Sequence, residues 1–138
     1  MDPLTVPGTL KSVRAVGRYV LAAAGEAGLE SQAAYRLRQA VDEIATNAVI
    51  HGYQPSGAEG DLHVSAHFDK KKLAIKLVDS SPAFDPLSVP PPADLEWQTS
   101  DRPAGGLGVF LALRGVDEFR HQRLHGHNHN TFVQYLKQ

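Results

Sequence analysis

The 138-residue sequence contains no cysteine, which excludes a disulfide framework and thiolate metal sites. No apolar run approaches the roughly 20 residues that cross a bilayer. The first seven residues also lack the basic and then apolar layout of a signal peptide. A formal net charge of −1 gives no general attraction to nucleic acid or anionic lipid. We therefore expect a soluble cytoplasmic protein with no membrane and no direct nucleic-acid partner.

What the sequence does have is enough apolar material for a core. Hydrophobic residues make up 42% of the chain, and 138 residues suit one domain. We find no internal repeat and no shift in composition that would separate two domains. The prediction is a single domain over residues 1–138.

The most informative stretch is residues 36–53, which carries helical periodicity. Its apolar stripe consists of Leu37, Val41, Ile44 and Ala48. Glu43 and Asn47 are four residues apart, so they share a face beside that stripe. Gly52 is expected to end the helix. An amide oxygen from Asn47 suits Mg²⁺ and a carboxylate from Glu43 suits proton transfer from a hydroxyl or water, although an ordinary polar helix flank has the same pattern.

The remaining periodicity predicts one helix before the helix that carries this stretch, and mainly strands after it. Alternation with a period of two marks an antiparallel hairpin and a final pair of strands. The predicted helices are one over 9–24, a second capped by Ser31, and a short one opening near Gly105. Leu107, Phe110 and Leu111 of the short helix are expected to face the core. The predicted strands cover 61–68, 73–79, 118–124 and 131–137, and residues 125–130 join the last two.

Residues 80–104 differ from the rest because six of the nine prolines fall there and no hydrophobic period persists. So long a loop inside a compact domain is typical of a lid. Gly105, Gly106 and Gly108 follow it and open a helix, which suits either a phosphate cradle or a simple turn. Asp79 stands at a strand end, where it can accept a hydrogen bond from an exocyclic amine or merely begin the turn.

Taken together, these segments resemble the GHKL ATPase superfamily and, within it, the anti-sigma-factor serine/threonine kinases of bacteria. Three stretches carry the resemblance, in the family order. The first is Glu43-Ile44-Ala45-Thr46-Asn47-Ala48 with His51-Gly52-Tyr53, and the second is Asp79 with Phe84-Asp85-Pro86. The third is Arg102-Pro103-Ala104-Gly105-Gly106-Leu107-Gly108. The resemblance implies an α+β two-layer sandwich with a mixed, mainly antiparallel sheet and helices on one face. The element order deduced above agrees with that fold class.

The resemblance also implies a role for each matching residue. Glu43 would be the general base, Asn47 would bind Mg²⁺ on ATP, and Asp79 would recognise the adenine amine. Arg102 would contact the γ-phosphate, and Thr131 would assist Asp79. The other implied nucleotide contacts are Phe84 and the backbone of Gly105, Gly106, Leu107 and Gly108. The implied partners are an anti-anti-sigma protein of the STAS type and a sigma factor or related regulator, and the implied assembly is a homodimer.

One position departs from the family pattern, which has glycine two residues after the adenine aspartate where this chain has Ser81. A serine is tolerated there if its φ is negative, and it strains the base pocket if the site needs positive φ. The alternative function is therefore a non-catalytic binding module with a degenerate nucleotide site. The cluster His125, His127 and His129 suits a polar hairpin connection better than a metal site, because no nearby carboxylate completes a ligand set.

Overall fold

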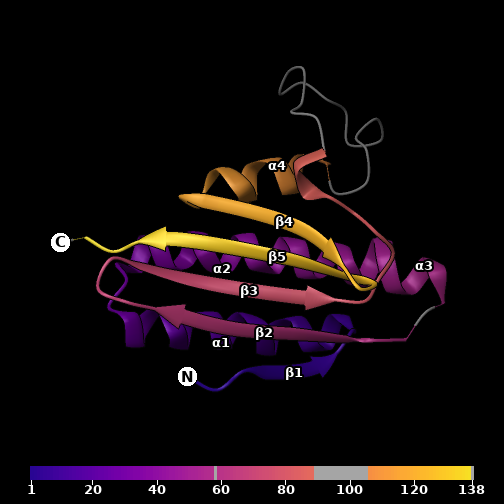
Figure 1. The fold of residues 1–138 in the computed structure, drawn as a ribbon, viewed down its shortest axis with the longest axis horizontal. Coiled ribbons are helices and arrows are strands. Elements are labelled where there is room, and N and C mark those ends of the chain that lie inside the picture. Colours follow the sequence, from indigo (N-terminus) through magenta and orange to yellow (C-terminus); the bar gives the residue numbers. More distant parts are fainter. Residues whose placement is uncertain (58, 89–105, 138) are drawn as a thin grey trace.

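A computed structural model describes residues 1–57, 59–88 and 106–137. Five antiparallel strands form one sheet in the order β1-β2-β3-β5-β4, and the helices cover one of its faces (Figure 1). The strands are β1 (Leu4–Pro7), β2 (Asp61–Phe68), β3 (Lys72–Asp79), β4 (Glu118–Leu124) and β5 (His127–Tyr135). The helices are α1 (Leu10–Ala27), α2 (Ser31–Asn47), a π-helical turn η1 (Ala48–Tyr53), α3 (Gln54–Ser56), a 3₁₀ turn η2 (Pro86–Ser88) and α4 (Gly106–Arg114).

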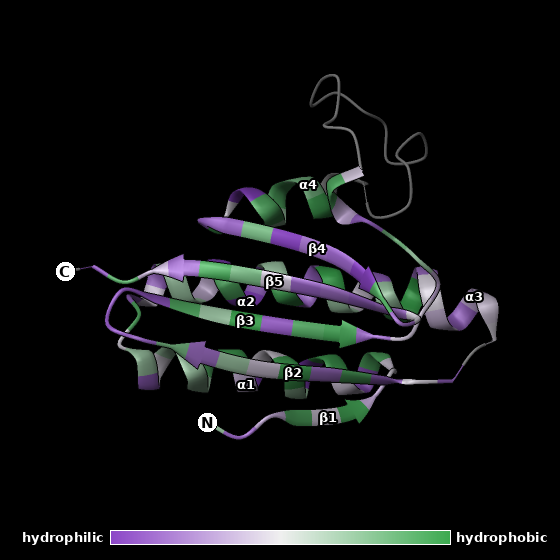
Figure 2. Cartoon of the chain, viewed as in Figure 1, coloured by the Kyte–Doolittle hydropathy of each residue, from purple (hydrophilic) through white to green (hydrophobic). Residues whose placement is uncertain are grey.

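The core lies between the sheet and the pair α1 and α2. Alternate residues of β2 and β3 are buried, which Figure 2 shows as bands of apolar colour along the strands. The predicted helical stripe is confirmed, because Leu37, Val41 and Ile44 on α2 and Ala48 at the start of η1 are all buried. Helix α4 packs against α2 beside the β4 edge. The predicted α+β class is therefore confirmed, with every strand pair antiparallel. No helix of this described part combines the length and apolarity needed to cross a bilayer.

The second helix ends later than its glycine suggests. Gly52 lies inside the π-helical turn, and the chain stays helical until Gly57, whose φ of 68° provides the left-handed cap. The prediction that Gly52 ends the helix is therefore wrong, as is the cap by Ser31, which is the first helical residue and follows Glu30. The hydroxyl of Tyr53 donates to the carbonyl of Asp61 at 2.8 Å. This bond ties the helix end to the first residue of β2.

The last hairpin is tighter than its sequence suggests. Only His125 and Gly126 form the turn, with φ of 50° and 79° as a two-residue turn requires. Strand β5 therefore begins at His127 rather than at Thr131, and residues 127–130 belong to the sheet.

Helix α4 buries a different face from the predicted one. Val109 and Ala112 are buried, whereas Leu111 is 54% exposed. Phe110 is half-buried beneath the guanidinium of Arg114, 5.4 Å from the ring centre. The prediction that Phe110 and Leu111 face the core is wrong, because the smaller residues meet α2 and allow a close approach. The side chain of Leu107 lies outside the described part.

Candidate functional site

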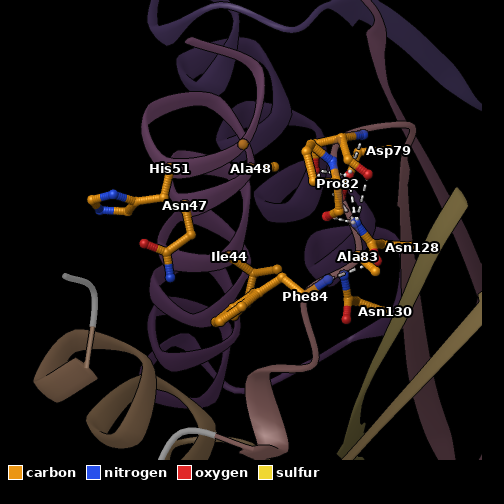
Figure 3. A pocket seen from close by; sticks show the side chains of 12 residues that line it. Ile44, Asn47, Ala48, His51, Asp79, Pro82, Ala83, Phe84, Asn128 and Asn130 are labelled. Carbon is orange, nitrogen blue, oxygen red and sulfur yellow. Dashed lines mark hydrogen bonds between the residues drawn. The ribbon is translucent and has the colours of Figure 1, made fainter. Parts of the chain in front are cut away.

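A cavity of about 160 Å³ opens between the end of α2 and the adjacent ends of β3 and β5 (Figure 3). An engineered cavity of about 150 Å³ accepts a benzene ring, so this one has room for a flat ring system. Three segments line it, and its residues are Ile44, Asn47, Ala48, His51 and Gly52 from α2 and η1, Asp79 and Ser81 to Phe84 from the end of β3 onward, and Asn128 and Asn130 from β5. Asn47 and Asp79 therefore share one cavity, as the sequence predicts.

Asp79 is 3% exposed and is held by three donors. Its Oδ1 accepts from the backbone N–H of Ser81 at 3.0 Å and from the Ser81 hydroxyl at 2.5 Å. The Nδ2 of Asn128 donates to the same oxygen at 3.0 Å. All the hydrogen bonds that the structure gives this carboxylate thus fall on one oxygen.

Ser81 fits without the backbone strain that a glycine position would impose. His125 is the one non-glycine residue with positive φ in the described ranges, so Ser81 stays in ordinary backbone space. Its side chain lies against Gly52, where an added Cβ would come 2.7 Å from the Ser81 Cβ. The absence of a side chain at 52 makes room for the one at 81.

Asn47 is the last residue of α2 and is 7% exposed. Its Nδ2 is buried and has no hydrogen-bond partner among residues 1–57, 59–88 and 106–137. A buried amide with an unpaired polar end favours a bound group, because leaving such a group unpaired costs about 1–3 kcal/mol. The oxygen and nitrogen of an amide can exchange places by a flip, so the unpaired position can hold the oxygen. An oxygen there fits the predicted role of Asn47 as a Mg²⁺ ligand.

Glu43 lies one helical turn before Asn47 and outside the cavity lining. Its carboxylate approaches Gly108 so closely that an added Cβ there would come 2.6 Å from the Glu43 Cδ. Burial raises the pKa of Glu43, and the positive charge that His51 carries when protonated partly offsets this rise. Glu43 therefore lies against Gly108 in the first turns of α4. This contact brings together the helix that carries Glu43 and Asn47 and the predicted glycine-rich start of α4.

Thr131 does not belong to this cavity, which corrects its predicted role. Strand β5 alternates between faces, and Asn128 pairs directly with Asp79 on the helix side of the sheet. Thr131 has the opposite parity, so it lies between Lys76 and Arg120 on the face turned away from the helices. Asn128 and Asn130 occupy the place that was predicted for Thr131.

The other predicted nucleotide contacts divide into two groups. Phe84 lines the cavity, and its backbone N–H donates to Asn128 Oδ1 at 3.3 Å. Gly106, Leu107 and Gly108 form the first turn of α4, which is the end that attracts anions. Arg102 and Gly105, together with most of the predicted lid over 80–104, lie outside the described residues.

The asparagines of β5, Asn128 and Asn130, line the cavity, and the sequence analysis missed them. Asn130 is 2% exposed, and its Oδ1 is 2.8 Å from His121 Nδ1. The available signal was the alternation of His and Asn over residues 127–130, which has the period of a strand although neither residue type is apolar.

The histidine cluster lies on the opposite face of the sheet. The rings of His127 and His129 are 6.4 Å apart between centres. Within the described part of the chain, no group of three His, Cys, Asp or Glu side chains is arranged to hold a metal ion. His125 is part of the turn, and His127 and His129 belong to β5.

Comparisons with known proteins agree with this geometry. A family model described as the histidine kinase-like ATPase domain matches residues 6–134. Among solved structures, the fold is similar to that of the RsbU and RsbW domains of Rv1364c from Mycobacterium tuberculosis, with a TM-score of 0.66 and 20% sequence identity. That alignment covers 100% of this chain and 33% of the other, so it shows a likeness of fold. No curated protein matches the chain.

Proposed function

Because the chain belongs to the histidine kinase-like ATPase domain family, we propose that it is an ATP-dependent protein kinase of the anti-sigma-factor type. It would bind Mg-ATP and transfer a phosphoryl group to a serine or threonine of a small regulatory protein. The observation that carries this proposal is that Asn47 and Asp79 face one cavity, with Glu43 one helical turn away against α4. The residues proposed as base reader and cation ligand thus share one cavity, and the proposed proton acceptor lies one helical turn from it.

The cavity suits the adenine end of the nucleotide. Asp79 would accept a hydrogen bond from the exocyclic amine, and Phe84, which is 40% exposed, would offer apolar surface to the ring. Asn47, at the α4 side of this cavity in Figure 3, would hold Mg²⁺ through its amide oxygen. The ion, when bound, would neutralise charge on the phosphates.

Glu43 would accept the proton of the substrate hydroxyl at its carboxylate. Its pKa is raised by burial, and a general base becomes more effective as its pKa approaches the working pH. The backbone amides at the start of α4 would bind the phosphates, with Gly105, Gly106 and Gly108 keeping side chains out of the way. Arg102 would meet the γ-phosphate and offset the charge that develops during transfer.

The partners follow from the kinase type. The proposed phosphoryl acceptor is an anti-anti-sigma protein of the STAS type, and the proposed sequestered partner is a sigma factor or a related regulator. We propose a homodimer as the working assembly. A pull-down from the native cell with ATP or ADP present would identify both partners by mass spectrometry.

The substitution Glu43→Ala tests the assignment of the base. We expect it to leave Mg-ATP affinity within about threefold while transfer to the captured STAS-type partner falls by about 10²-fold or more, as for loss of a general base. Glu26→Ala, an exposed change on α1, is the matched control and should transfer at the wild-type rate. Equal transfer by the Glu43 variant and the wild type would remove Glu43 from this role.

The second candidate function is a protein-binding module without nucleotide chemistry. Its motivation is that Ser81 stands where the family pattern has glycine, and its hydroxyl occupies one acceptor position of the Asp79 carboxylate. A thermal-shift titration separates the two functions, since a ligand at 100 times its Kd stabilises a fold by about 2.7 kcal/mol. Absence of any shift at millimolar Mg-ATP would favour the binding module.

A further inference from the structure

We infer that Ser81 and Asn128 are positioning residues that set the nucleobase selectivity of the cavity. They hold one oxygen of Asp79 and leave the other to read the base. The inference rests on the proposed function, because it presumes that the cavity takes a nucleotide. It adds two residues of this chain that the family resemblance does not supply.

The first argument is the distribution of hydrogen bonds on the Asp79 carboxylate. Oδ1 accepts two bonds from Ser81 and one from Asn128, at 2.5 to 3.0 Å. Three donors occupy the acceptor positions of that oxygen. Within the described residues, Oδ2 receives no such bond, so it is the oxygen of this carboxylate that remains for a ligand.

The second argument is that both positioning residues are themselves fixed. Asn128 lies directly opposite Asp79 in the pairing of β3 with β5, and its Nδ2 also reaches the carbonyl of Pro82 at 3.1 Å. Its Oδ1 accepts from the N–H of Phe84, so both ends of the amide are used and its orientation is set. Arg123 donates to the carbonyl of Ser81 at 2.7 Å, which anchors that residue to β4.

The chemical consequence concerns the group at position 6 of a purine. A carboxylate oxygen that cannot turn away attracts an amine donor and repels a carbonyl oxygen. Adenine presents an amine there and hypoxanthine presents a carbonyl. If Ser81 or Asn128 is truncated, the carboxylate gains freedom to rotate and to bind water, and the preference for the amine weakens. The proposed triphosphate contacts lie elsewhere, so affinity for an inosine nucleotide does not fall, and the preference changes through weaker binding of the adenine nucleotide.

The test measures dissociation constants of the full chain for Mg-ATP and for Mg-ITP by calorimetry. We expect the wild type to prefer ATP, and Ser81→Ala and Asn128→Ala each to reduce the ATP-to-ITP preference about tenfold through weaker ATP binding, which is the loss of one strong hydrogen bond. Ser80→Ala is the matched control, because the Ser80 hydroxyl contacts the Tyr53 hydroxyl at 3.1 Å and not Asp79. It should keep the wild-type preference within about twofold, well short of the loss expected from one strong hydrogen bond.

Each outcome decides the inference. A wild type that prefers ATP, with variants that keep the same preference, overturns the positioning role and leaves the proposed function standing. A wild type that binds neither nucleotide overturns the proposed function and the inference together. Equal binding of ATP and ITP by the wild type shows that Asp79 does not read the amine. Thermal melting of each variant checks its fold, and Ser81→Gly replaces Ser81→Ala if that variant does not fold.

Discussion

The close packing of Gly52 against Ser81 predicts a measurable energetic coupling between the two positions. A methyl group added at 52 would lie 2.7 Å from the Cβ of Ser81 and 2.8 Å from its hydroxyl oxygen. Carbon atoms in contact normally lie about 3.5–4.0 Å apart, so the chain must shift by the better part of an ångström. The perturbation is therefore Gly52→Ala.

Two opposing effects set the size of the change. Overpacking a tight site costs about 1–3 kcal/mol, and replacing glycine by alanine inside a helix gains about 1 kcal/mol. We expect Gly52→Ala to lower the free energy of unfolding by about 1 kcal/mol. In the background of Ser81→Gly the overlap disappears, so the same change should gain up to about 1 kcal/mol. The coupling between the two positions is then about 2 kcal/mol.

Urea denaturation at 25 °C on the four members of this cycle measures the coupling, with unchanged m-values as a check that the transitions are comparable. Gly25→Ala is the control for helix propensity, because Gly25 is exposed in α1 and nothing lies within 4 Å of an added Cβ. The packing argument is refuted if Gly52→Ala stabilises the protein as Gly25→Ala does, or if its effect is the same in both backgrounds.

Two further predictions concern Glu43. Gly108→Ala places a Cβ 2.6 Å from the Glu43 Cδ, so the carboxylate must move. Phosphoryl transfer should fall at least about 10²-fold in a radiolabel assay, and the free energy of unfolding should change by no more than about 1 kcal/mol. Glu43→Gln tests the raised pKa of Glu43. Because burial favours the protonated carboxyl, Glu43 contributes to folding stability below its ordinary pKa of 4.5, and this contribution is lost as pH rises through the folded-state pKa. Melting curves from pH 3.5 to 7.5 should therefore show the variant gaining on the wild type as pH rises, and a shrinking gap would contradict the burial argument.

The fold was predictable where periodicity is long and apolar. Helix α2 and the hairpin of β2 and β3 show their periods over eight or more residues, and both form, although the cap and end of the helix differ from the prediction. Strand β1 has four residues, too few to show a period, and its partner β2 lies more than fifty residues away. The early start of β5 was missed because residues 127–130 alternate between two polar types, which read as a loop.

The site was predictable on α2 more than at the ends of β3 and β5. Glu43 and Asn47 are one turn apart on a helix, so their common face follows from spacing alone. The Ser81 contact with Gly52 joins residues from different elements, and no local pattern contains it. Asn128 depends on the register of β5 against β3, which only the tertiary structure fixes.

The two-residue turn at His125 and Gly126 has a further consequence for evolution and engineering of this chain. Downstream, Phe132 is fully buried and anchors the strand, so an extra residue inserted after Gly126 must be absorbed before that anchor. Until it is absorbed, every side chain changes sides: imidazoles would enter the space beside Asp79 and the asparagines would face solvent. The length of this loop therefore decides which side chains of β5 line the cavity.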